Sequence, residues 1–131
     1  MKTVIDALNA KYKVYHLKGA SEADIKIAEQ KLGLSFSPEY MTYLATYGLL
    51  SFASHEFTGL GADGYLNVVS ATEKERSLGG QFPKDCILLE NNGIDGLLTL
   101  QDSKGYVYSF NDGKKKKIAS SFSEYIKMCL E

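Results

Sequence analysis

The sequence has few of the residues that build metal sites and disulfide frameworks, and it has no long apolar run. Its 131 residues contain two cysteines, two histidines, two prolines and no tryptophan. The histidines and cysteines lack the spacing of metal ligands, so we expect no metal and no cofactor. No stretch approaches the ~20 apolar residues of a membrane span, and residues 1–6 do not begin a signal peptide. We therefore expect a cytoplasmic protein with no membrane contact.

The two cysteines, Cys86 and Cys129, both stand within apolar patterns. In a chain without secretion signals, this placement favours reduced core thiols over a disulfide. We expect both thiols to be buried and not bonded to each other.

Recognisable catalytic motifs are also absent. Neither Gly-x-Ser-x-Gly nor His-Glu-x-x-His occurs. His55 precedes Glu56, but adjacent residues of a strand point to opposite faces, so the two do not form an acid–base pair. The glycine-rich residues 59–64 lack the Lys-Ser/Thr of a phosphate-binding loop and are interpreted as a turn. The sequence favours a protein that is not an enzyme.

Charge is nearly balanced, with 15 basic and 16 acidic side chains and a net charge of −1. This balance argues against direct nucleic-acid binding through overall charge. Residues 114–117 are four consecutive lysines in a strand-like segment after a turn. Such a run can bind phosphate, but lysines also protect a sheet edge from pairing, and we favour this second interpretation.

Helix signals are the strongest local pattern that the sequence does contain. Ser21 and Ser37 are placed to cap two successive helices, and Gly33 and Gly48 are placed to end them. Leu44 stands at helical spacing from its apolar neighbours, so we expect it in the core.

The remaining pattern predicts a single domain of the α+β class over residues 1–131. A helix is expected over residues 2–12, a connector over 13–20 and short strands within 49–60. A further helix over 68–78 would begin with a capping box formed by Ser70 and Glu73. An antiparallel meander and a last helix starting at Ser121 complete the chain, with strands expected over residues 86–89, 97–101, 106–110 and 114–119.

Residues 32–48, LGLSFSPEYMTYLATYG, resemble the signature of the SMI1/KNR4 family, within the SUKH superfamily. Further matching pieces follow in the family's order, so that the resemblance covers about residues 20–127; they are residues 67–69, 72–76, 90–96 and 100–108. One departure is Ser37, which separates Phe36 from Pro38. The resemblance implies a curved, mostly antiparallel sheet with helices packed on one side.

Bacterial members of this superfamily act largely as immunity proteins. The resemblance therefore implies a non-enzymatic, antitoxin-like protein that binds and neutralises a cognate toxin domain, possibly a nuclease. The fungal relatives imply an alternative, a regulatory scaffold that binds endogenous signalling or cell-wall proteins. The sequence leaves the oligomeric state open.

A nuclease must present a positive groove to its substrate, so an inhibitor is expected to face it with carboxylates. Exposed tyrosines often anchor such contacts. Turn formation could equally explain Asp95 and Asp102. An alternative contact surface is the sheet face on which Tyr106, Tyr108 and Phe110 alternate, although core packing also explains these rings. The candidate partner-binding residues are Glu56, Asp63, Tyr65, Glu73, Glu75, Glu90, Asp95 and Asp102.

Overall fold

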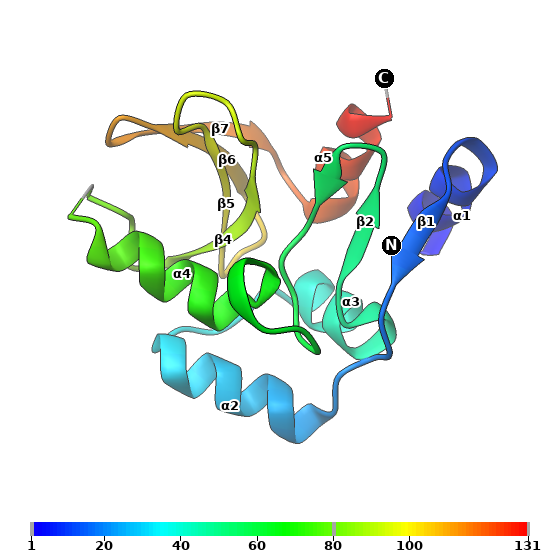
Figure 1. The fold of residues 1–131 in the computed structure, drawn as a ribbon, viewed down its shortest axis with the longest axis horizontal. Coiled ribbons are helices and arrows are strands. Elements are labelled where there is room, and N and C mark those ends of the chain that lie inside the picture. The colour runs from blue at the N-terminus through cyan, green and yellow to red at the C-terminus, as the bar shows by residue number, and fades with distance from the viewer. Residues whose placement is uncertain (1, 80, 131) are drawn as a thin grey trace.

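The computed structural model describes residues 2–79 and 81–130 (Figure 1). The first half comprises α1 (Lys2–Lys11), β1 (Val14–His16), α2 (Glu22–Leu32), α3 (Pro38–Tyr47), β2 (Leu50–Phe52) and β3 (His55–Glu56). The second half comprises the 3-10 helix η1 (Gly64–Leu66), α4 (Val68–Ser77), β4 (Cys86–Asn91), β5 (Leu98–Asp102), β6 (Val107–Asn111), β7 (Lys114–Ala119) and α5 (Phe122–Cys129). This order confirms the predicted α+β class.

The helices begin and end largely where the sequence predicts. The Ser21 and Ser37 hydroxyls accept hydrogen bonds from the backbone N–H groups of Asp24 and Tyr40, at 3.1 and 3.2 Å. Gly33 ends α2 in the left-handed conformation, with φ of 67°. Within the described residues, no helix combines the length and apolar composition needed to cross a bilayer.

The start of α4 differs from the prediction. Asn67 caps this helix, because its side-chain oxygen accepts hydrogen bonds from the N–H groups of Val69 and Ser70. Ser70 and Glu73 therefore lie inside the helix and form no capping box. Asn is as good a cap as Ser, and it stands three residues earlier.

The strands form two antiparallel sheets, with the orders β1-β2-β3 and β4-β5-β6-β7. Strand β1 lies within the segment expected as a connector, and its mostly exposed side chains gave no alternating pattern. A bridge between Phe57 and Glu90 continues β3 onto β4 and joins the two sheets.

Thr58 sits at this junction and is almost fully buried. Its backbone N–H donates to the Leu89 carbonyl at 2.9 Å, and its hydroxyl donates to the Leu88 carbonyl at 2.7 Å. The Tyr43 hydroxyl donates to the Thr58 carbonyl at 2.8 Å and accepts from the Leu50 N–H at 3.0 Å. One residue thus connects α3, β2 and β4.

Each face of the four-stranded sheet borders its own apolar cluster. Ile87, Leu89 and Val107 pack into the main core with α1, α3 and α5. Leu88 and Leu100 point the other way and pack with Ala71 of α4 in a second cluster. The sequence predicted helices on one side of the sheet, and the structure adds α4 beneath the arch of β4–β7 on the other side (Figure 1).

The aromatic row on β6 is divided between core and surface. Phe110 is buried in the second cluster, Tyr108 is half-buried against it, and Tyr106 is exposed. Core packing therefore explains Phe110, as the sequence allowed, but not Tyr106.

Replacing Leu44 with alanine tests the predicted core. Leu44 is fully buried on α3, so L44A should lower the free energy of unfolding by about 2–5 kcal/mol, the usual range for a core leucine. Chemical denaturation measures this change. The exposed Thr46 on the same helix provides the control, since T46A should stay within about 0.5 kcal/mol of the parent. Equal stability of L44A and the parent would contradict the packing of α3.

The two thiols differ in burial, which partly corrects the sequence prediction. Both are free, Cys86 is fully buried, and Cys129 is only half-buried because it ends α5. Burial raises the pKa of the Cys86 thiol to about 12. Alkylation followed by mass spectrometry should label Cys129 well before Cys86, because only a solvent-accessible thiolate reacts rapidly. The difference should vanish in denaturant, and faster labelling of Cys86 in the native protein would overturn the assignment.

Candidate functional site

The residues predicted to bind a partner do not form one continuous acidic face. Glu56, Asp63, Tyr65, Glu73 and Asp95 are exposed, Glu75 and Asp102 are half-buried, and Glu90 is buried. The exposed members fall into separate groups, each fixed by a different element.

The first group surrounds Tyr65, which stands on η1 with 68% of its surface exposed. The Tyr65 hydroxyl donates to the Glu56 carboxylate of β3, at 3.2 and 3.3 Å from its two oxygens. This hydrogen bond raises the pKa of Tyr65, because the nearby negative charge disfavours a phenolate. The contact holds an exposed aromatic ring in one orientation beside an exposed carboxylate.

A pocket of about 290 Å³ opens beside this pair. Tyr65, Lys74, Glu75 and Asn91 contribute polar groups to its lining, and Ala71 and Leu88 contribute apolar ones. Glu75 also borders a neighbouring hollow of about 470 Å³ along α4. We call Glu56, Tyr65 and Glu75 the Tyr65 rim.

The second group lies between α2 and α4. Asp63 and Glu73 line a groove of about 670 Å³ together with Asp24 and Lys31 of α2. Glu73 and Glu75 are two positions apart on α4, and a helix turns about 200° over two residues, so they face different sides. The two glutamates that the sequence placed together therefore belong to different surfaces.

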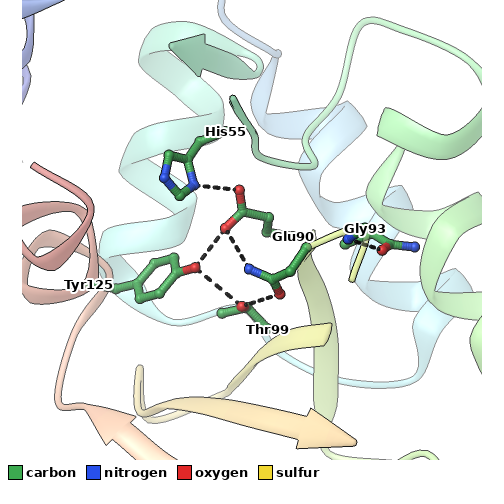
Figure 2. Close-up of polar contacts among 7 residues, drawn as sticks. His55, Glu90, Gly93, Thr99 and Tyr125 are labelled. Atoms are coloured by element: carbon green, nitrogen blue, oxygen red, sulfur yellow. Dashed lines mark hydrogen bonds and ion pairs between the residues drawn. The ribbon is translucent and has the colours of Figure 1, made fainter. Parts of the chain in front are cut away.

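Glu90 is only 2% exposed, which corrects the expectation that it presents a carboxylate to a partner. It accepts a hydrogen bond from Tyr125 of α5 at 2.6 Å and pairs with His55 Nδ1 at 2.7 Å (Figure 2). Thr99 extends the network by bonding to the Tyr125 hydroxyl and to Asn92. Because a buried carboxylate is costly without partners, this network is the physical reason that Glu90 can lie inside.

His55 pairs with Glu90 rather than with Glu56, as the alternation of strand side chains predicts. The two neighbours diverge, and Glu56 instead reaches Tyr65. Hydrogen bonds to Cys129 and to Glu90 raise the pKa of His55 to about 10. Tyr125, whose pKa is raised mainly by burial and then by Glu90, stays neutral and donates. His55 is therefore the cationic partner of a buried carboxylate at neutral pH.

The last two candidates lie in turns at opposite ends of the sheet. Asp95 is an exposed turn residue with φ of 45° between β4 and β5. Asp102 accepts hydrogen bonds from the N–H groups of Lys104 and Tyr106 at 3.0 Å and from the Tyr108 hydroxyl at 2.8 Å. These bonds give Asp102 a structural role in the β5–β6 turn, and neither residue lines the Tyr65 pocket.

Sequence reasoning missed Lys74 and Asn91, which line the Tyr65 pocket. Lys74 is one of several charged residues on α4, and Asn91 ends a strand, so neither stood out from its surroundings. Their proximity depends on how α4 crosses β4. Among residues 2–79 and 81–130, no group of three or more His, Cys, Asp or Glu side chains is arranged to hold a metal.

The His55–Glu90 pair predicts a specific pH dependence of stability. The pKa of His55 rises from 6.5 to about 10 on folding, so its protonation stabilises the fold fully below pH 6.5, and this contribution is lost as pH rises towards 10. The difference in unfolding free energy between the parent and H55Q should shrink over this interval. Denaturation at a series of pH values measures it. H16Q is the control, because His16 is exposed and its ring nitrogen contacts a backbone carbonyl, that of Leu17, rather than a buried carboxylate. A pH-independent difference would contradict the pairing.

Comparison with known proteins identifies the family to which the chain belongs. The model of the family described as SMI1-KNR4 cell-wall, SUKH_5, matches residues 1–131. A crystal structure of a protein from Pseudomonas syringae pv. tomato is similar, with a TM-score of 0.79 and 14% sequence identity, over 97% of this chain and 96% of that one. Comparison with curated proteins finds no significant match. The structural similarity shows a shared fold, and the family match covers the whole sequence: the chain belongs to the SMI1-KNR4 family of the SUKH group.

Proposed function

We propose that this protein is a non-enzymatic immunity protein of the cytoplasm, which binds and neutralises a cognate toxin through the Tyr65 rim. Membership of the SMI1-KNR4 family is consistent with such a role and with protein partners in general. The toxin surface would be positively charged, as in the substrate groove of a nuclease. Binding there would block the groove without chemistry by the inhibitor.

The observation that carries this proposal is the Tyr65–Glu56 pair. A tyrosine that is 68% exposed offers a large apolar ring to a partner, and tyrosines are frequent hot spots of protein interfaces. Its hydrogen bond to Glu56 holds the ring before binding, which lowers the conformational entropy lost on association. The pocket beside it could receive one side chain of the partner.

Charge at the rim supports the same choice of partner. Glu56 and Glu75 flank Tyr65 and together outweigh the positive charge of Lys74 in the pocket lining, so a cationic surface would be attracted while it is still in solution. Such attraction mainly increases the association rate and the discrimination against wrong partners. A toxin that must be captured before it damages its target makes fast association useful.

An alternative role is a regulatory scaffold for endogenous signalling or cell-wall proteins. The description of the matching family contains the words cell-wall, which favours keeping this role as the second candidate. It would use the same exposed rim. Co-expression with a toxin candidate encoded by the neighbouring gene separates the two roles, since only an immunity protein restores growth.

Paired charge reversals test the rim. E56K/E75K should slow association with the toxin about tenfold, reduce its salt sensitivity and weaken protection of growth, because the attracting charge becomes repulsive. Binding kinetics at two salt concentrations measure the effect, and circular dichroism checks the fold.

D63K/E73K provides the matched control, because it changes the net charge equally within the α2–α4 groove. This variant should protect cells nearly as well as the parent. Full protection by E56K/E75K would exclude the Tyr65 rim. Equal loss in both variants would point to overall charge rather than to this surface.

A further inference from the structure

A second surface lies on β7, the strand at the far edge of the four-stranded sheet from β4. Its first four residues, 114–117, are all lysines and all exposed. None of them forms an ion pair with another residue of the described part of the chain. The run therefore concentrates positive charge on one sheet edge of a protein whose net charge is −1.

The two edge strands of this sheet differ in whether their outward backbone groups are hydrogen-bonded. On β4, Thr58 bonds to the Leu88 and Leu89 carbonyls, and the Thr72 hydroxyl accepts from the Leu88 N–H. On β7, within the described residues, the backbone of residues 114–117 pairs only with β6. The β4 edge is closed by the protein itself, whereas the β7 edge keeps free backbone donors and acceptors.

The register identifies which groups are free. Asp112 and Gly113, with φ of 54° and 77°, form a two-residue turn between Asn111 and Lys114. Residues that flank such a turn are a hydrogen-bonded pair, and bonded and non-bonded pairs alternate along an antiparallel ladder. The N–H and C=O groups of Lys115 and Lys117 therefore point outward, away from β6.

The lysine side chains are also partly ordered. The ammonium group of Lys115 lies 4.4 Å from the centre of the Tyr108 ring, and that of Lys117 lies 4.0 Å from the centre of the Tyr106 ring. These cation–π contacts cover ring faces that nucleic-acid bases would need for stacking. The geometry thus disfavours nucleic acid as the ligand.

From these features we infer that the open edge of β7 binds an acidic, extended segment of a partner protein, which adds to the sheet as a further strand. Backbone hydrogen bonds to Lys115 and Lys117 would hold the segment, and carboxylates opposite the lysines would select it. A second copy of this chain is a poor occupant, because lysines would face lysines. The run therefore protects the edge from pairing with copies of the chain, as the sequence predicts, and leaves it open only to a strand of opposite charge. This edge is separate from the Tyr65–Glu56 pair, which lies with β3 at the β4 side of the sheet, and the inference does not depend on the proposed function.

The test uses the purified protein and a synthetic, acetylated peptide of alternating Glu and Val with Thr at both ends. Binding should slow amide hydrogen exchange at Lys115 and Lys117 more than at Lys114 and Lys116, because only the first pair points outward. The variant K114Q/K115Q/K116Q/K117Q should bind the peptide about tenfold more weakly, because it loses the cross-strand charge pairs. The control variant K13Q/K18Q/K26Q/K31Q has the same net charge and should bind like the parent.

Two further probes distinguish strand addition from binding by charge alone and from binding of nucleic acid. A peptide with Pro in place of Val keeps the charge but cannot pair as a strand, so it should bind much more weakly. Equal binding of both peptides, or uniform protection of the four lysine amides, would overturn strand addition. Preference for single-stranded oligothymidylate over the acidic peptide, or concentration-dependent self-association through β7, would also overturn the inference. E56K, one of the two rim substitutions, should bind the peptide normally, because Glu56 lies on β3, which continues onto β4 at the other edge of the sheet; this separates the result from the test of the Tyr65 rim.

Discussion

The hydrogen bonds of Thr58 are the constraint on which the rest of the structure depends. The Thr58 carbonyl accepts a hydrogen bond from the Tyr43 hydroxyl of α3, and its hydroxyl and N–H donate to the carbonyls of Leu88 and Leu89 in β4. Thr58 also directly follows the bridge that joins the two sheets. Because Thr58 is buried, loss of one of these hydrogen bonds would leave an unpaired donor or acceptor and lower the free energy of unfolding by about 1–3 kcal/mol. Each partner therefore requires the others to be in position, which fixes α3, β2 and β4 relative to one another.

The local features of the fold could be predicted because they depend on short segments. Caps at Ser21 and Ser37 and terminating glycines specify α2 and α3 almost to the residue. Strand β1 could not be predicted in the same way, because its three residues become a strand only by pairing with β2. The cap of α4 was misplaced because Asn67 and Ser70 are both acceptable cap residues, and in the structure the Asn67 side chain accepts the hydrogen bonds of the first turn.

The candidate site was predictable in composition but not in arrangement. Tyr65 and Glu56 were singled out for exposure and charge, and the structure places them in contact. Glu90 looked like its exposed neighbours in the sequence, because the burial of a carboxylate depends on partners far along the chain, here His55 and Tyr125. Balanced composition also concealed a separation of charge, since Glu56 lies on β3, which continues onto β4, whereas the four lysines lie on β7 at the opposite edge of the four-stranded sheet.

The network around Glu90 has a consequence for how the molecule opens. Helix α5 has only eight residues, and it holds one of the hydrogen bonds that compensate a buried charge. If α5 detached, the Glu90 carboxylate would lose Tyr125 and favour water, and its pair with His55 on β3 would weaken. Local unfolding of the last helix would therefore spread to the strand that carries Glu56. We therefore expect the C-terminal helix and the strand that carries Glu56 to unfold as one cooperative unit, so that the order of the exposed surface would depend on a helix remote from it in sequence.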